Sequence, residues 1–371
     1  ELPVIGYETR EELAYEPAKF WVRVLKREKR GSHCLEEQGV VTAAAPAQII
    51  PKGKLSNEFI IEVLAQKYQQ HLPVYRQCAT LAEDHGIELS RKTLTDALLA
   101  AGGLLRAVVQ AQQAELLAGG YIQADETPMP CQTLEKTGRN HRAYMWEYSL
   151  PGGIVVFDFR MSRGRDGPKE FLKGFRGTLQ SDGYGVYADL GEGIVYAGCL
   201  SHARREFVDA AKVAPHDPLP TEIIARFGEL YAVERQARQA GLGAEARQAL
   251  RQTQSAPVMA LLKERLIAIR QLIVPGGTLA KACGYALGQW SRLEEYLRDG
   301  RLEIDNNGAE RSLRGIAVGR KNWLWYGSDR GGQTAAILTS FTATCKRLRI
   351  DPFAYLRDVF DRISAHPASR L

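Results

Sequence analysis

After residue 50 the order of apolar and polar positions follows a helical period. Phe59, Ile60 and Val63 recur at a spacing close to 3.6 residues, which predicts a helix in this stretch. Two more helices are predicted downstream, separated by a turn at Gly86. We therefore expect residues 51–118 to form a helical region.

The two helices around that turn have the layout of a helix-turn-helix, a DNA-binding motif. The second helix would begin after Ser90 and would offer Arg91 and Lys92 to DNA. A plain helical bundle in which Ser90 caps a helix accounts for the same pattern. The sequence leaves both interpretations open.

Beyond residue 118 the pattern changes to short apolar runs that are typical of strands. The predicted strands cover residues 121–124, 141–150, 154–160, 178–181 and 193–200, with a short helix at 168–175 and another helix from Ser201. Pro151-Gly152-Gly153 makes a good hairpin turn between the two longest runs. Residues 119–217 are expected to form a mixed α/β sheet.

Residues 218–300 return to a helical spacing, with Ile223, Phe227 and Leu230 among the apolar positions. This stretch is expected to be an all-helical domain inserted into the α/β fold. Residues 301–371 are predicted to resume that fold and to end in two helices.

The first 50 residues contain short strand-like runs, such as residues 20–25, followed by the basic cluster at residues 26–30. They are expected to form a small strand-rich lobe. Because the chain begins with Glu1 and not with Met, we expect the natural start to lie upstream.

Composition restricts the class of protein. A length of 371 residues predicts two or three structural units, and 45% hydrophobic with 25% charged residues is typical of a folded globular protein. We find no run near the ~18 apolar residues that would span a bilayer, and no basic and then apolar leader. The expectation is a cytoplasmic protein without a membrane partner.

Cysteine and charge add two further restrictions. The six cysteines are scattered without a Cys-x-x-Cys pair, so neither a disulfide scaffold nor a zinc ribbon is supported. The net charge is +6, and residues 301–371 hold 12 Lys and Arg against 7 Asp and Glu. Such a mild excess indicates either contact with nucleic acid or an ordinary solvated surface.

Three acidic residues stand where a sheet or helix would present them. Asp125 and Asp182 each end a predicted strand, and Glu310 lies at the start of a predicted helix. Each has a structural alternative, because Asp is a common turn former and Asn307-x-x-Glu310 has the spacing of a capping box. Together, two aspartates and a glutamate can hold two divalent cations for phosphodiester cleavage. Hard oxygen ligands of this kind suit Mg²⁺ or Mn²⁺.

Five motifs in order then resemble a known family, the DDE transposases of insertion sequence 66. The motifs are Asp125-Glu126-Thr127-Pro128, Ser181-Asp182-Gly183-Tyr184, Cys199 to Arg205, Ile304 to Arg311, and Gly319 to Trp323. The resemblance runs from about residue 2 to residue 363. It implies a ribonuclease H-like mixed sheet interrupted by a helical insertion, with Asp125, Asp182 and Glu310 as the catalytic, metal-binding triad.

The resemblance also bears on the cysteines. Cys199-x-x-His202 looks like half of a zinc site, but the chain offers no second pair, so we favour a role in supporting the active site. Relatives usually carry a cysteine-pair zinc module near the N-terminus. Here only His33 and Cys34 remain of it, which leaves zinc binding by this chain doubtful.

Several basic residues near these motifs are candidates for contact with DNA, beside Arg91 and Lys92. They are Arg204, Arg205, Arg311, Arg320 and Lys321, with Trp323 as a residue that could stack on an unpaired base. Each has a plainer alternative. The arginines can be solvated, and tryptophans are commonly buried. Glu310 and Arg314 are four residues apart on a predicted helix, where a simple ion pair between them is the plainer interpretation.

The sequence therefore predicts a transposase that cuts the ends of its mobile element and joins the freed 3′-hydroxyl to target DNA. Expected partners are the terminal inverted repeats and target DNA, further copies of the chain in a homo-oligomer, and two accessory proteins of the same element. Two alternatives remain: a ribonuclease H-like nuclease or resolvase that cuts without joining, and a domesticated DNA-binding protein.

Overall fold

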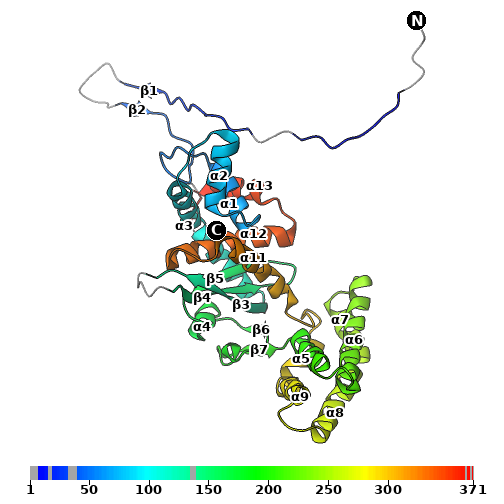
Figure 1. The fold of residues 1–371 in the computed structure, drawn as a ribbon. Coiled ribbons are helices and arrows are strands. Elements are labelled where there is room, and N and C mark those ends of the chain that lie inside the picture. The colour runs from blue at the N-terminus through cyan, green and yellow to red at the C-terminus, as the bar shows by residue number, and fades with distance from the viewer. Residues whose placement is uncertain are drawn as a thin grey trace.

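The computed structural model describes residues 7–15, 19–31, 40–133, 139–363, 366–367 and 370. Figure 1 shows a central sheet covered by helices, with a second group of helices beside it, at the end of the sheet where β6 and β7 lie. Residues 7–15 run away from both parts as an extended arm.

The sheet is mixed, as predicted. Its strands are β3 (Tyr121–Cys131), β4 (His141–Ser149), β5 (Val155–Arg160), β6 (Gly177–Gln180) and β7 (Ile194–Ala197). Their spatial order is β5-β4-β3-β6-β7, so the long strand β3 lies in the centre. β3 pairs antiparallel with β4 and parallel with β6, with Gln123 opposite Gln180. Beyond these two glutamines β3 continues to Cys131, paired with β4, whereas β6 ends at Gln180.

Helices from both ends of the chain pack on this sheet. They are α1 (Asn57–Tyr68), α2 (Val74–His85), α3 (Arg91–Ala118), α11 (Asn307–Trp323), α12 (Asp329–Leu348) and α13 (Pro352–Ile363), together with the short α4 (Asp166–Phe171) and η1 (Gly185–Tyr187). Ile60, Leu98, Phe341 and Phe360 are all buried in one hydrophobic cluster with the sheet. The helices predicted around Gly86 are confirmed, and Ser90 does cap α3 by accepting a hydrogen bond from the Thr93 amide.

Helix α12 covers the edge strand β5 through hydrogen bonds as well as apolar packing. The Phe157 amide donates to Ser340 Oγ at 2.8 Å, and the Val155 amide donates to Thr344 Oγ1 at 3.0 Å. Gln333 Nε2 donates to the Phe159 carbonyl at 2.8 Å. Backbone groups at the edge of the sheet thus find hydrogen-bond partners in the side chains of α12.

The second helical group has a hydrophobic core of its own. Its elements are α5 (Leu200–Val213), α6 (Pro218–Gln239), α7 (Ala244–Leu250), the π-helical turn η2 (Arg251–Ser255), α8 (Ala256–Leu272), α9 (Thr278–Gly288), α10 (Trp290–Leu293) and η3 (Glu295–Leu297). Phe207 of α5 packs on Phe227 of α6, with ring centroids 6.0 Å apart. α5 therefore packs with the helices of residues 218–300, although its sequence directly continues the sheet.

The N-terminal region differs from the expectation of a strand-rich lobe. Among described residues up to 50, pairing is confined to two two-residue strands, β1 (Lys29–Arg30) and β2 (Val41–Thr42). The run at residues 20–25 is not a strand, and Trp21 within it is 76% exposed. An apolar run forms a strand only where a partner strand pairs with its backbone and a core buries its side chains. His33 and Cys34 lie outside the described residues.

Helix α3 differs from the expectation that no stretch is long and apolar enough to span a bilayer. By length and composition alone, α3 is apolar enough to cross a membrane. Leu94, Leu98 and Leu105 on this helix are nearly or completely buried in the core beside the sheet. The apolar face of α3 is therefore used for packing within the protein.

Candidate active site

Asp125 and Asp182 lie just past the paired glutamines of neighbouring strands. Asp125 is in β3, two residues after Gln123, and Asp182 follows β6, two residues after Gln180. Each aspartate also accepts a local hydrogen bond. Asp125 Oδ1 accepts one from the Glu126 amide at 2.8 Å, and Asp182 Oδ1 accepts one from the Tyr184 amide at 2.9 Å. The strand expected to end before Asp125 continues to Cys131 because it stays paired with β4, so only Asp182 lies at a strand end and in a turn.

Glu310 reaches the same region from the first turns of α11. Its Oε1 lies 3.6 Å from His202 Nε2 and its Oε2 lies 3.7 Å from Arg205 Nη2, both on α5. The capping box expected for Asn307 and Glu310 is not formed. The helix cap is Asn306, and Glu310 turns toward α5 because two cationic or polar groups attract it there.

The pKa of Asp125 reflects its burial and the acidic groups around it. Burial raises the pKa of Asp125 from 3.8 to about 8, and the neighbouring charge of Glu126 adds to the rise, followed by the charges of Asp182 and Glu310. Glu310 Oε1 is buried without a hydrogen-bond partner in the described structure. Acidic groups thus gather between β3, β6 and α11, and the raised pKa of Asp125 is typical of a candidate functional site.

The geometry of these oxygens is not that of a closed metal cage. Within the described ranges, no three His, Cys, Asp or Glu side chains lie at the spacing that would hold one metal ion. The types of donor nevertheless fit a hard divalent cation, since all three are carboxylates. The unpartnered Oε1 of Glu310 is a buried acceptor that such a cation would satisfy.

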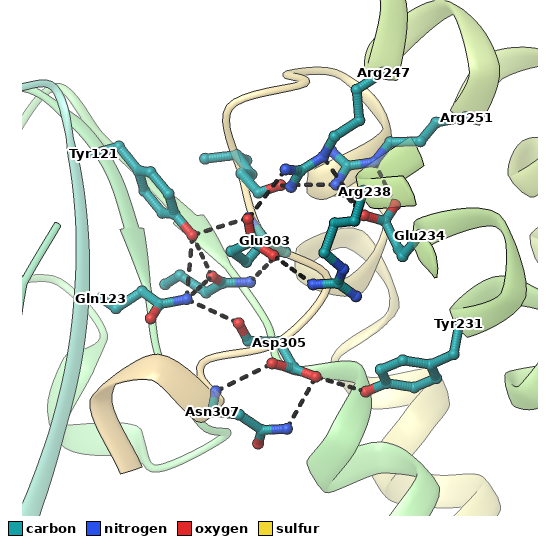
Figure 2. A network of polar contacts seen from close by, with 12 residues as sticks. Tyr121, Gln123, Tyr231, Glu234, Arg238, Arg247, Arg251, Glu303, Asp305 and Asn307 are labelled. Carbon is teal, nitrogen blue, oxygen red and sulfur yellow. Dashed lines mark hydrogen bonds and ion pairs between the residues drawn. The ribbon is translucent and has the colours of Figure 1, made fainter. Parts of the chain in front are cut away.

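A buried polar network explains why the three segments that bear these acids meet. Gln123 Nε2 donates to Gln180 Oε1 at 2.9 Å, and both glutamine side chains are fully buried. Gln123 Nε2 also donates to the Asp305 carbonyl at 2.8 Å, and Gln180 Nε2 donates to the Glu303 carbonyl at 2.8 Å. Residues 302–307, which we call the return segment, are thereby fixed to both strands (Figure 2).

Sequence reasoning missed this network and also a second buried acid. The side chain of Glu126 is only 2% exposed. It accepts hydrogen bonds at 2.6 Å from Arg163 Nη2 and from the Tyr187 hydroxyl. The Arg163 guanidinium in turn lies 3.8 Å from the centroid of the Tyr184 ring. The available signal for Glu126 was a charged residue directly after an apolar run and next to Asp125.

The helical group also touches the loop of Asp182. A Cβ atom added to Gly183 would lie 2.7 Å from the Tyr285 hydroxyl oxygen of α9. Glycine is therefore required after Asp182 for Tyr285 to approach this closely. The charge of Asp182 helps to raise the pKa of Tyr285 to about 12, after the larger effect of burial.

Cys199 and His202 occupy different positions around Glu310. Cys199 is buried at the start of α5, and burial raises the pKa of its thiol to about 12, so the thiol stays protonated at neutral pH. His202, one turn later, lies beside Glu310. In the described part of the chain the two do not form part of a cluster that could hold a metal.

The candidate DNA contacts are spread over several elements. Arg91 and Lys92 are exposed at the start of α3, where Lys92 pairs with Asp96, while Arg311 and Lys321 are exposed on α11. Arg204 is half-buried on α5, next to the exposed Arg205. These residues lie on three elements, and Arg205 on α5 contacts Glu310, the residue before Arg311 on α11.

Two of the candidates are engaged inside the protein. Arg320 donates a hydrogen bond to the Pro128 carbonyl of β3. The Trp323 ring packs against the main core and lies 6.1 Å from the His71 ring. Trp323 would have to leave these contacts before it could stack on a base.

Comparison with known proteins places the chain in a family. The family model described as "Transposase IS66 family" matches residues 52–334, and the IS66 C-terminal element matches residues 340–371. Among curated proteins, the chain is 32% identical to the uncharacterized protein y4hP of Sinorhizobium fredii (strain NBRC 101917 / NGR234), covering all of this chain and 70% of that protein. It is 34% identical to y4jD of the same organism, covering 97% of this chain and 72% of the relative.

Among solved structures, the Drosophila P element transposase strand transfer complex matches with a TM-score of 0.39 and 11% identity. That match covers 81% of this chain and 94% of the other. The family matches define the class of protein as an enzyme that acts on DNA. The chain belongs to the IS66 family of transposases, so its function is that of a DNA transposase and DNA is its partner.

Proposed function

We propose that Asp125, Asp182 and Glu310 form the catalytic centre of this transposase and that the surrounding fold is ribonuclease H-like. Support for the fold comes from the sheet, in which three antiparallel strands are followed by two parallel ones in the order β5-β4-β3-β6-β7. Support for the site comes from one observation above all. Burial and the charge of Glu126 raise the pKa of Asp125 most, and the charges of Asp182 and Glu310 add to the rise, which supports a shared site for the three carboxylates.

The chemistry proposed for the site is cleavage of the element end followed by joining of the freed 3′-hydroxyl to target DNA. Asp125, Asp182 and Glu310 would hold Mg²⁺ or Mn²⁺. Bound there, divalent cations would supply activation of the attacking oxygen and stabilisation of the leaving oxygen. His202 and Arg205 flank Glu310 and would orient its carboxylate toward the two aspartates.

Other parts of the chain are assigned to this function by proposal. Residues 218–300 would be an insertion between the second aspartate and the glutamate. Arg91, Lys92, Arg204, Arg205, Arg311 and Lys321 would contact DNA phosphates, since all of them are at least partly exposed. A homo-oligomer would hold two ends together, with two accessory proteins of the element, and the location would be cytoplasmic.

The test is incubation of the protein with labelled end DNA and Mg²⁺ or Mn²⁺. We expect cut and joined products from the wild type, and at least about a hundredfold less cleavage from Asp125→Asn, Asp182→Asn and Glu310→Gln, because amides lack the anionic oxygens that bind hard cations. Asp209→Asn, an exposed change on α5, is the control and should cut normally.

The products separate the alternatives. Cut but unjoined DNA would indicate a nuclease or resolvase, and binding without cleavage would indicate a DNA-binding protein. Near-normal cutting by one of the three variants would remove that residue from the catalytic centre.

A further inference from the structure

We propose that the helical group of residues 218–300 positions Glu310, through Tyr231 of α6 and Asp305 of the return segment. The inference rests on the proposed role of Glu310 in the catalytic centre. Tyr231 and Asp305 are then positioning residues, since they act on Glu310 through the start of α11.

Asp305 is the point at which the helical group meets the start of α11. The Tyr231 hydroxyl donates to Asp305 Oδ2 at 2.9 Å, and Asn307 Nδ2 donates to the same oxygen at 3.0 Å. The Asn307 amide donates to Asp305 Oδ1 at 3.2 Å. The carboxylate of Asp305 therefore links α6 to the first residue of α11, one turn before Glu310.

The return segment is held by the helical group at a second place (Figure 2). Arg247 Nη1 donates to Glu303 Oε1 at 3.0 Å, and Arg251 Nη2 donates to the Leu302 carbonyl at 2.8 Å. Arg251 is fully buried and is paired with Glu234 at 2.7 Å. A buried, paired arginine of this kind fixes the segment firmly, because breaking the pair would leave an uncompensated charge.

The return segment thus lies between two sets of contacts. Gln123 and Gln180 hold its backbone from the sheet, whereas Tyr231 and Arg247 hold its two acidic side chains from the helical group. Asp125 lies in β3, so its position does not depend on contacts between the return segment and the helical group. A displacement of α6 is therefore expected to disturb the start of α11, and with it Glu310, more than Asp125.

The test compares Tyr231→Phe with wild type, because this change removes one hydroxyl and keeps the packed ring. Hydrogen exchange of the α11 amides at residues 309–313 should become about threefold to tenfold faster, as expected for the loss of one hydrogen bond of ordinary strength. The Mn²⁺ concentration for half-maximal cleavage should rise by a similar factor, with unchanged melting temperature and DNA affinity. Asp305→Asn should show the same two effects, and the double variant should show little more.

Glu222→Gln is the matched control on the same helix. It breaks an ion pair between α6 and Arg265 of α8 at 2.8 Å that does not involve the return segment. This variant should leave both readouts as in the wild type.

Unchanged exchange at residues 309–313 in Tyr231→Phe would overturn the inference, even if the wild type cleaves DNA. A faster exchange in that region, together with a wild type that does not cleave, would support the coupling and refute the proposed catalytic role. An equal effect in Glu222→Gln would show general loosening of α6 and would also overturn the inference.

Discussion

Asp125 is the residue at which the catalytic proposal has the clearest consequence for stability. Its pKa is raised from 3.8 to about 8, so between these pH values the folded protein keeps a proton that the unfolded chain has released. Stability contributed by this group is complete below about pH 4 and is lost as the pH rises through 8. The ionised form of Asp125 thus costs the folded state free energy at neutral pH.

Asp125→Asn removes this cost, because an amide does not ionise. We expect the variant to match the wild type in urea unfolding near pH 4 and to exceed it by about 1–3 kcal/mol at pH 8.5 without divalent cations, allowing for solvent screening of a partly exposed group. Added Mg²⁺ should narrow the difference by stabilising the wild type. Coincident unfolding curves at both pH values would show that ionised Asp125 does not destabilise the folded protein.

Single residues also show how far the sequence can predict a site. Asp125, Asp182 and Glu310 were singled out because each was expected at the end of a strand or the start of a helix within a familiar motif, although Asp125 lies inside β3. Gln123 and Gln180 were not found, because their hydrogen bond joins residues 57 positions apart and depends on the parallel register of β3 and β6. Trp323 shows the converse. The basic and aromatic residues around it in the sequence suggested base stacking, whereas in the structure its ring packs against the core.

At the scale of elements, Arg347 joins three of them around a buried acid. From α12 it donates to the Gly308 carbonyl at 3.1 Å and to Ser312 of α11, and to the Leu150 carbonyl at 3.0 Å. It also lies 3.5 Å from Glu147 of β4, which is fully buried. Burial raises the pKa of Glu147 to about 7, although the charge of Arg347 opposes the rise. Arg347 thus docks the helix that carries Glu310 on the sheet.

Arg347→Met should destabilise the protein by about 3–5 kcal/mol at pH 8, because it leaves Glu147 buried and unpaired. Below pH 6 the loss should be smaller, since Glu147 can then be protonated at little cost. Urea unfolding at the two pH values measures the difference. The double variant Arg347→Met with Glu147→Gln should recover part of the stability at pH 8, and a loss that is equal at both pH values would contradict this role for the pair.

Elements were predicted well where their signal is local. The apolar spacing of α1 and α3, and the serines that cap them (Ser56 and Ser90), are features of neighbouring residues in the sequence. Those two helices therefore lie where the pattern indicates. The packing of α5 was not predictable in this way, because its buried face is decided by α6 and α9, which follow it in the chain.

For the whole molecule, the main core is built from residues that precede the second helical group in the sequence and from residues that follow it. The C-terminal part should therefore depend on the rest of the chain for folding. Residues 301–371 supply α11 and α12, whose buried sides face β3, β4 and β5. Expressed alone, this fragment should show no cooperative thermal transition by circular dichroism, and co-expression with residues 1–300 should restore one. A fragment that melts cooperatively by itself would mean that it is an independent domain and that residues 218–300 are not an insertion.

The covered edge of β5 has a consequence for synthesis on the ribosome. The bond between Val155 and Thr344 joins residues 189 positions apart, so β5 leaves the ribosome long before the helix that covers it. At about 5–20 residues per second, this interval lasts roughly ten to forty seconds. During that time an apolar strand edge with unpaired amides is open to other nascent chains. Chains cut short before α12, for example by a nonsense mutation, would keep that edge permanently and are expected to aggregate or to be degraded.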